Sequence, residues 1–341
     1  MAAAATKDVV CVTGGSGFIG SWTVRLLLER GYTVHATVKD LNDEKETKHL
    51  KAMDFADSRL RLFQMDLLDY DSILAAVQNT VGVIHMASPN TIERVEDPER
   101  DLLGPAIEGT KKVLEAAKAS GVKRVVVTAS VSGIIPSPKW PADVVKDENC
   151  WTDIDYCKQK ELLYPISKTF AEKAAYEFSK ETGVAVACVN PGTVLGPFLP
   201  PVINASMAML VSLLKGSNNL LTRRKSFAFV AGCTDVYEDF YMGCVHVQDV
   251  ALAHILCYEN KSATGRHLCV EGITHFSDFA AKVAELYPNY KVPSFPKDTQ
   301  PGLLRAKDPA KKLINMGLKF HTMEEIIKDS VESLKSRGCI A

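Results

Sequence analysis

An α/β fold around a doubly wound parallel sheet is predicted by two features of the 341-residue sequence. Short apolar runs rich in β-branched residues alternate with longer amphipathic segments through residues 1–190, as strands and helices do in such a sheet. The first run, residues 9–12, is followed almost at once by three glycines spaced three residues apart. Beyond residue 190 the alternation breaks down, which predicts a smaller, mixed α/β lobe.

The glycine turn and its flanking elements predict a dinucleotide-binding Rossmann domain. Residues 9–12 are typical of a strand buried on both faces, and residues 21–30 begin a helix. Gly14 permits the sharp turn, Gly17 lets backbone N–H groups approach a pyrophosphate, and Gly20 lets helix and strand pack closely. A glycine-rich loop without a ligand is the alternative, but the strand before it and the helix after it favour nucleotide binding.

The residue after the second predicted strand, 33–38, bears on the choice of nicotinamide cofactor. An acidic residue there binds the ribose 2′-hydroxyl of NAD, whereas a basic residue accommodates the 2′-phosphate of NADP. Here the position is Lys39, with Lys45 a short loop away and Ser16 in the glycine turn able to donate a hydrogen bond. Asp40 can serve NAD if it turns inward, so NAD stays open as the alternative to NADP.

Polar and small residues follow the next two predicted strands, 60–65 and 81–86. Asp66 can meet an adenine amino group or instead cap the helix predicted at 70–77, a role that Asp69 can fill equally well. Small residues after the second strand let backbone lie against a cofactor. The expected cofactor-binding residues of the whole chain are Gly14, Ser16, Gly17, Phe18, Ile19, Gly20, Lys39, Lys45, Asp66, Leu67, Ala87, Ser88, Pro191 and Val194.

Three residues form a candidate catalytic set. Ser130 follows the predicted strand 122–128, at the sheet edge where ligands bind in open α/β folds, and Ser132 is its alternative. Tyr164 and Lys168 stand four residues apart, on one face of a predicted helix. Because a nearby ammonium group lowers the pKa of a phenol, Tyr164 can donate a proton to a carbonyl oxygen that Ser130 also hydrogen-bonds.

The same Tyr-x-x-x-Lys spacing occurs a second time, at Tyr156 and Lys160. An uninterrupted amphipathic helix follows Tyr164, whereas Tyr156 lies in a charged connector flanked by cysteines. The sequence therefore favours Tyr164.

Composition predicts an ordinary soluble protein of one large or two smaller domains, with 46% hydrophobic residues and a formal net charge of −1. No basic tail indicates nucleic-acid binding, and no apolar stretch approaches the ~20 residues of a membrane span. The first residues do not resemble a signal peptide, so a cytoplasmic location is expected. The nine cysteines lack the spacing of metal sites, and Cys150 and Cys157 either stay free or form a regulatory disulfide.

Several motifs together resemble the extended short-chain dehydrogenases/reductases. They are Thr-Gly-Gly-Ser-Gly-Phe-Ile-Gly at 13–20, the set of Ser130, Tyr164 and Lys168, and Asn-Pro-Gly-Thr-Val-Leu-Gly-Pro at 190–197. More narrowly, Ser-Trp at 21–22, Ala-Thr-Val-Lys-Asp at 36–40, Ala-Ser-Pro at 87–89 and Val-His-Val-Gln-Asp-Val-Ala at 245–251 resemble the plant cinnamoyl-CoA reductase and dihydroflavonol reductase group.

This resemblance implies an NADPH-dependent reductase of a small aromatic, phenylpropanoid-type carbonyl, expected as a monomer or homodimer. It implies that Tyr164 donates the proton, that Lys168 lowers the pKa of Tyr164 and holds the nicotinamide ribose, and that Ser130 polarises the oxygen. Two alternatives stay open. An NAD-dependent sugar-nucleotide epimerase or dehydratase has the same fold but is expected to have an acidic residue in place of Lys39. The other is a non-catalytic NADP-binding protein, disabled by an apparent insertion at 217–231.

Two departures from that group bear on the substrate. Residues 161–168 read Glu-Leu-Leu-Tyr-Pro-Ile-Ser-Lys, where cinnamoyl-CoA reductases have Asn-Trp-Tyr-Cys-Tyr-Gly-Lys. A His and a Lys that help to hold CoA in the family correspond here to Met209 and Ser212, neither of which is a cation. A free aldehyde or ketone stays an expected substrate, and a CoA thioester is put in question.

The domain organisation follows from where the alternation stops. Residues 1–190, joined by 244–270, are expected to form the NADP-binding domain, and residues 191–243 and 271–341 the substrate-binding lobe. Apolar residues at 202–210 either line a pocket for an aromatic substrate or form a plain helical core.

Three helices are predicted near the C-terminus, at 277–287, 309–316 and 323–336. Asp308 is the candidate N-cap of the middle helix, with Pro309 at its first position.

Overall fold

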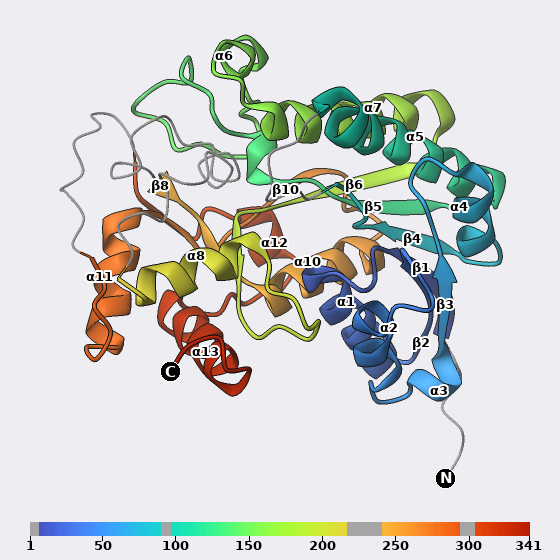
Figure 1. The fold of residues 1–341 in the computed structure, drawn as a ribbon. Coiled ribbons are helices and arrows are strands. Elements are labelled where there is room, and N and C mark those ends of the chain that lie inside the picture. Colours follow the sequence, from blue (N-terminus) through green and yellow to red (C-terminus); the bar gives the residue numbers. More distant parts are fainter. Residues whose placement is uncertain (1–6, 90–96, 217–240, 294–303) are drawn as a thin grey trace.

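The computed structural model describes residues 7–89, 97–216, 241–293 and 304–341 (Figure 1). Within them the chain forms the predicted doubly wound sheet with helices on both faces and a smaller lobe beside it. The apparent insertion at 217–231 lies outside the described residues.

The central sheet has the strand order β10-β6-β5-β4-β1-β2-β3, and every neighbouring pair is parallel. Its strands are β1 (Lys7–Thr13), β2 (Tyr32–Val38), β3 (Leu60–Gln64), β4 (Gly82–His85), β5 (Arg124–Thr128), β6 (Ala185–Pro191) and β10 (Gly265–Cys269). The order reverses at β1, which pairs with β2 on one side and β4 on the other. Ligands of open α/β sheets bind beside such a reversal, and the glycine turn follows β1 there.

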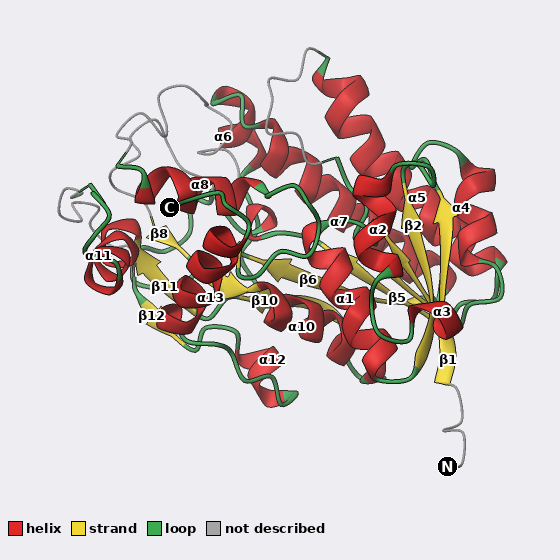
Figure 2. Ribbon diagram, turned by 60° about the horizontal axis from the view of Figure 1, so that its bottom comes forward, coloured by secondary structure: helices red, strands yellow, loops and turns green. Residues whose placement is uncertain are grey.

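Helices cover both faces of this sheet, as Figures 1 and 2 show. One face carries α1 (Phe18–Glu29), α2 (Glu44–Lys51), α10 (Val247–Glu259) and α12 (Lys311–Asn315), and the other carries α4 (Tyr70–Val77), α5 (Gly104–Ala119) and α7 (Leu163–Thr182). Val10 and Val12 of β1 pack in the core beneath α1, whereas Cys11 packs in the core beneath α5. Alternate strand residues point to opposite faces, which explains the unbroken apolar run.

In its described residues, the smaller lobe combines short strands with three helices. It contains β7 (Thr193–Leu195), β8 (Tyr241–Met242), β11 (Gly272–His275) and β12 (Ala306–Lys307), with α8 (Ala205–Leu214), α11 (Phe276–Leu286) and α13 (Met323–Ser336). β7 pairs in parallel with β9 (Cys244–His246), which leads into α10 on the central sheet. Met207, Met209 and Leu210 of α8 are buried in its core, whereas Val202 before α8 is 66% exposed. Of the two alternatives for residues 202–210, the structure has the helical core.

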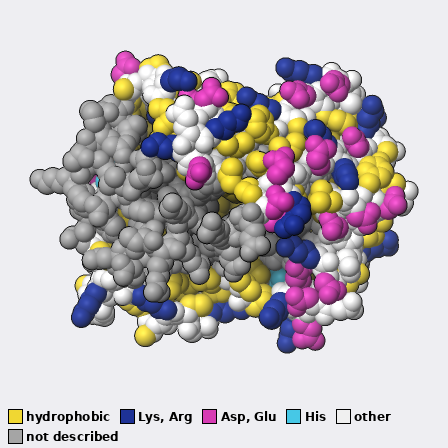
Figure 3. Space-filling model, turned by 45° about the horizontal axis from the view of Figure 1, so that its top comes forward, with side chains coloured by type: hydrophobic (Ala, Val, Ile, Leu, Met, Phe, Trp, Pro, Cys, Tyr) yellow, Lys and Arg dark blue, Asp and Glu magenta, His cyan; other side chains and the backbone are white. Residues whose placement is uncertain are grey.

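Among the described residues, four short elements lie between the strands and helices of the central sheet: α3 (Ala56–Arg59), the π-helix η1 (Glu99–Leu103), the 3-10 helix η2 (Val131–Gly133) and α6 (Ile154–Gln159). Among the described ranges, no helix combines the length and apolarity that a membrane crossing requires. On the face in Figure 3, the described part of the surface shows Lys and Arg side chains interspersed with Asp and Glu.

Two predicted helix starts differ from the structure by two residues or more. α1 begins at Phe18 because Gly17, in an extended conformation, is its N-cap. The prediction that Asp308 caps the helix at 309–316 is wrong. Asp308 has a φ of 49°, in the left-handed region, whereas an N-cap is typically extended. The helix there is α12, which begins later, after Ala310.

Candidate active site

The glycine turn brings the start of α1 to the carboxyl edge of the sheet. Gly14 has a φ of 68°, and a Cβ there would lie 2.9 Å from the Ala87 nitrogen. A Cβ on Gly20 would overlap the Gly14 carbonyl group. The first turn of α1 holds no acidic residue, and a helix N-terminus without a counter-charge favours an anion. The backbone at Phe18 and Ile19 therefore suits a pyrophosphate.

An acidic residue of α2 lies between Ser16 and Lys39, and the sequence analysis did not single it out. The Lys39 backbone nitrogen donates to Glu46 Oε2 at 2.6 Å, and Ser16 Oγ donates to the same oxygen at 3.5 Å. Asp40 accepts a hydrogen bond from the backbone nitrogen two residues later. Because Lys39 is exposed and basic, this corner still suits a 2′-phosphate, with Glu46 competing for its donors.

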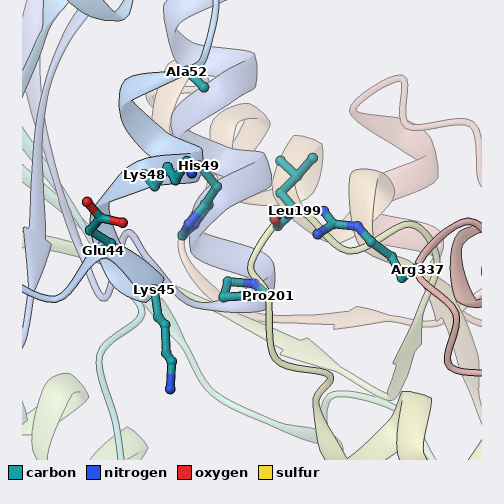
Figure 4. Close-up of a pocket in the computed structure, with 8 residues that line it drawn as sticks. All are labelled: Glu44, Lys45, Lys48, His49, Ala52, Leu199, Pro201 and Arg337. Carbon is teal, nitrogen blue, oxygen red and sulfur yellow. Dashed lines mark hydrogen bonds between the residues drawn. The ribbon is translucent and has the colours of Figure 1, made fainter.

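A cavity of about 330 Å³ lies beside this corner, between α2 and the segment after β7 (Figure 4). It is lined by Glu44, Lys45, Lys48, His49, Ala52, Leu199, Pro201 and Arg337. His49 connects it to the start of α1, since its Nε2 lies 2.9 Å from Ser21 Oγ. Figure 4 shows Lys45 extending away from Arg337. None of the predicted catalytic residues lines this cavity, so it is not where the carbonyl group of a substrate reacts.

The remaining predicted cofactor residues lie at strand ends. Asp69 caps α4, whereas Asp66 accepts a hydrogen bond from the backbone nitrogen two residues later. Asp69 is therefore the cap, and Asp66 stays exposed at the carboxyl end of β3. Leu67 packs against α5, while Pro191 ends β6 and Val194 lies in β7, both buried.

Ser130, Tyr164, Lys168 and Ser88 come together between β5 and α7. The Ser130 side chain hydrogen-bonds Tyr164, and its Oγ also accepts from the Ser132 backbone nitrogen at 3.1 Å. Lys168 Nζ lies 5.8 Å from the centroid of the Tyr164 ring and donates to Ser88 Oγ at 3.0 Å. A hydroxyl, a phenol and an ammonium group thus converge at one point of the sheet edge, which is an arrangement suited to proton donation.

The protonation of this set differs from the sequence-based expectation in one respect. Burial raises the pKa of Tyr164 to about 12, and it is the hydrogen bond with Ser130 that opposes this rise. Burial also lowers the pKa of Lys168 to about 8, against an opposing effect of Glu172. The pKa of Tyr164 is therefore raised overall and not lowered as expected, because enclosure disfavours the charged form of each group. Tyr164 keeps its proton, as a proton donor requires.

A neutral histidine supports the loop after β4. His85 Nδ1 lies 2.8 Å from Thr13 Oγ1, and His85 Nε2 lies 3.2 Å from Thr110 Oγ1. Burial, together with Lys168, lowers the pKa of His85 to about 3. Thr13 Oγ1 also accepts from the Ala87 nitrogen at 3.1 Å, which fixes the start of the exit loop.

The connector between β5 and α7 holds the residues of two open alternatives. Tyr156 lies in the short helix α6 and packs with Cys157 in a small apolar cluster, and Lys160 is the exposed C-cap. Cys150 and Cys157 are both buried free thiols, so no disulfide joins them. Burial raises the pKa of Cys157 to about 11, which leaves the thiol protonated.

A histidine pair lies between α10 and α13. The rings of His246 and His321 stack with centroids 4.1 Å apart and planes inclined by 20°, and Asp329 Oδ2 lies 3.3 Å from His246 Nε2. Imidazole binds a metal along a nitrogen lone pair in the ring plane, so two nearly parallel stacked rings do not converge on one ion. The geometry of these three residues therefore does not suit a metal.

Comparison with known proteins gives a consistent family. The NAD dependent epimerase/dehydratase family matches residues 10–270. Cinnamoyl-CoA reductase CAD2 of Medicago truncatula is 42% identical, over 97% of this chain and 96% of its own length. Tetraketide alpha-pyrone reductase 1 of Arabidopsis thaliana is 35% identical, over 98% of each chain.

Solved structures share the architecture. Vestitone reductase from alfalfa (Medicago sativa L.) has a TM-score of 0.79 and 30% identity, covering 98% of this chain and 100% of its own. Yeast methylglyoxal/isovaleraldehyde reductase Gre2, complexed with NADPH, has a TM-score of 0.78 and 26% identity, covering 97% and 100%. The chain belongs to the NAD dependent epimerase/dehydratase family, the extended short-chain dehydrogenases/reductases, and its predicted resemblance to the cinnamoyl-CoA reductase group is confirmed.

Proposed function

We propose that the protein is an NADPH-dependent reductase of a small aromatic carbonyl compound, a phenylpropanoid-type aldehyde, ketone or CoA thioester. The observation that carries this proposal is the contact of Ser130 with Tyr164 beside Lys168, at the carboxyl end of β5. Relatives named as reductases, at 35% to 42% identity, support reduction over sugar-nucleotide epimerisation. Lys39 supports it too, since an epimerase of this fold is expected to have an acidic residue there.

The residues at the start of α1 and the end of β2 fit the cofactor. Bound NADPH supplies the hydride. We assign its pyrophosphate to the backbone at Phe18 and Ile19, where the helix N-terminus favours an anion. Its 2′-phosphate is assigned to Ser16, Lys39 and Lys45, which together supply a hydroxyl and two cations.

Tyr164 gives its phenolic proton to the substrate oxygen as the carbonyl carbon is reduced. Burial keeps that proton in place until the carbonyl oxygen gains negative charge. Ser130 donates a hydrogen bond to the same oxygen and stabilises the developing charge. Lys168, held by Ser88, would hold the nicotinamide ribose of the bound cofactor, and its ammonium group stabilises the phenolate that Tyr164 becomes.

Oxidation of NADPH by the purified protein tests the proposal, with coniferaldehyde, a simple aryl aldehyde, dihydroquercetin and feruloyl-CoA compared side by side. Reduction of only the free carbonyls places the protein among aldehyde or ketone reductases. Turnover of feruloyl-CoA means that the enzyme accepts a CoA thioester although Met209 and Ser212 are not cations. NADPH binding without reduction of any of these compounds overturns the proposal in favour of a non-catalytic protein.

The proposal includes the organisation of the chain. Residues 1–190 and 244–270 form the NADP-binding domain, and residues 191–243 and 271–341 form the substrate-binding lobe. The protein works in the cytoplasm as a monomer or homodimer, and light scattering of the eluted protein measures which.

A further inference from the structure

We propose that Glu172 is a positioning residue for the proton-donating set. It fixes the backbone of Ser130 through the side chain of Asn190, and it supports the charge of Lys168 from one helical turn away. This role rests on the function proposed above.

The carboxylate of Glu172 lies inside the protein, with the residue only 1% exposed. Arg266 of β10 donates from Nε to Oε1 at 2.8 Å and from Nη2 to Oε2 at 3.2 Å. Asn190 of β6 donates to Oε2 at 3.1 Å, and the Tyr176 hydroxyl donates to Oε1 at 3.4 Å. Burial raises the pKa of Glu172, and Arg266 leads the groups that oppose the rise. So many donors suit an ionised carboxylate.

One amide joins this carboxylate to the candidate catalytic serine. The Asn190 nitrogen that contacts Glu172 also donates to the carbonyl oxygen of Ser130 at 3.1 Å. Arg266 holds the following turn, because its Nη2 donates to the Gly133 carbonyl at 2.7 Å. A Cβ on Gly133 would lie 2.7 Å from Glu172 Oε2. The turn that carries Ser130 is therefore built directly against the ion pair.

The same carboxylate acts on Lys168. The two residues are four apart on α7 and both are buried, so their side chains share one face of the helix. The other titratable groups around Lys168 are Tyr164 on α7, His85 on β4 and, behind Glu172, Arg266 on β10. Neighbouring elements carry charges in ion pairs that are at least partly exposed, Arg100 with Asp101, Lys111 with Glu108 and Lys139 with Asp153. Glu172 raises the pKa of Lys168, whereas burial lowers it.

Stability alone does not account for this pair. A buried ion pair gives little net stability relative to apolar residues, because both charges lose their hydration. Its bonds instead reach Ser130 and the turn to Gly133 from β6 and β10, which are separate strands of the sheet. These bonds fix the position of Ser130 and of the turn that follows it.

The test is Glu172→Gln in the full chain, with Glu177→Gln as the matched control on the exposed face of α7. Glutamine has nearly the shape of glutamate but carries no charge. The pKa of Lys168 therefore falls, and Lys168 loses its proton at a lower pH. We expect kcat to fall by about 10- to 100-fold, the usual cost of a misplaced catalytic group. We also expect the basic limb of the kcat profile to move to lower pH, while the Kd of NADPH changes little. Glu172→Asp should recover part of both effects, and Glu177→Gln should behave as the wild type.

Unchanged kcat and an unchanged pH profile in folded Glu172→Gln overturn the role of Glu172. An unpaired Arg266 can prevent folding of this variant, so the double variant Glu172→Gln/Arg266→Gln, which removes both charges, should show a smaller shift of the basic limb in the same direction. Tyr164→Phe, measured alongside, separates the two proposals. Activity retained in Tyr164→Phe overturns the assignment of Tyr164 as the proton donor in the proposed function, whereas its loss with an unaltered Glu172→Gln overturns only the positioning role.

Discussion

The backbone nitrogen of Lys39 donates to Glu46 Oε2 at 2.6 Å, so a carboxylate of α2 occupies the corner where the 2′-phosphate of NADP is expected. Ser16 donates to the same oxygen. A carboxylate and a phosphate repel each other and compete for the same donors. Glu46 therefore repels the 2′-phosphate that Lys39 attracts. The preference between NADPH and NADH depends on the balance of these two effects.

Glu46→Gln is expected to tighten NADPH binding by up to about fivefold, because exposed charge pairs contribute ~0.2–1 kcal/mol. NADH binding should change less, since NADH has no 2′-phosphate. Fluorescence titration of both cofactors measures the two Kd values. Glu44→Gln, in the same exposed turn of α2, is the control. An equal change for NADPH and NADH contradicts the assignment of this corner to the 2′-phosphate.

Lys39→Asp is expected to shift the preference toward NADH. The substitution removes a cation and supplies a carboxylate to the ribose 2′-hydroxyl. Hydrogen bonds to charged groups contribute ~1.5–3 kcal/mol, so the ratio of kcat/KM for NADPH over NADH should fall at least about tenfold. Lys48→Asp, an exposed charge reversal on α2, should leave that ratio nearly unchanged. Unchanged selectivity in Lys39→Asp means that the phosphate is held elsewhere.

The strands could be predicted from sequence because a strand that is buried on both faces has a continuous run of apolar residues, as in β1 and β5. The ends of helices were harder to predict from sequence, because a helix cap depends on backbone conformation as well as on residue type. Gly17 caps α1 without a side-chain hydrogen bond, and Asp308 has a suitable side chain but a left-handed backbone.

The candidate site could be predicted where its chemistry is local in sequence. Tyr164 and Lys168 share one helix face through their spacing alone. Arg266 and Asn190 come from different strands and contact Glu172 only when the sheet forms. Their contact with Glu172 therefore cannot be predicted from spacing in the sequence. The one available signal was an acidic residue on the buried face of α7, one turn beyond Lys168.

His321→Gln tests a pH-dependent contribution to stability from outside the active site. Buried Asp249 accepts from the His321 backbone nitrogen at 2.9 Å and lies 2.7 Å from its Nδ1, and this hydrogen bond raises the pKa of His321 above 6.5. A raised folded-state pKa contributes stability that is fully present below the unfolded pKa and is lost as pH rises through the folded value. Stacked His246 has a lowered pKa, so it does not compete for the proton.

The difference in melting temperature between wild type and His321→Gln should therefore be largest near about pH 5, below the ordinary histidine pKa. It should shrink as pH rises past the raised pKa of His321. Scanning fluorimetry at a series of pH values measures this difference, and the control His49→Gln should show the opposite trend because burial lowers the pKa of His49. A difference that stays constant with pH contradicts a charged His321.

Tyr164→Phe is expected to bind NADPH normally yet lose most turnover, by about 10²- to 10⁴-fold, the usual contribution of a positioned proton donor. Phenylalanine keeps the ring beside Lys168 and removes only the hydroxyl that contacts Ser130. Tyr156→Phe removes the same group from the second Tyr-x-x-x-Lys copy, on α6, and should stay active. Steady-state rates and NADPH titrations of both variants decide between them. The reverse pattern assigns proton donation to Tyr156, and loss in both variants means that α6 and α7 act on the substrate together.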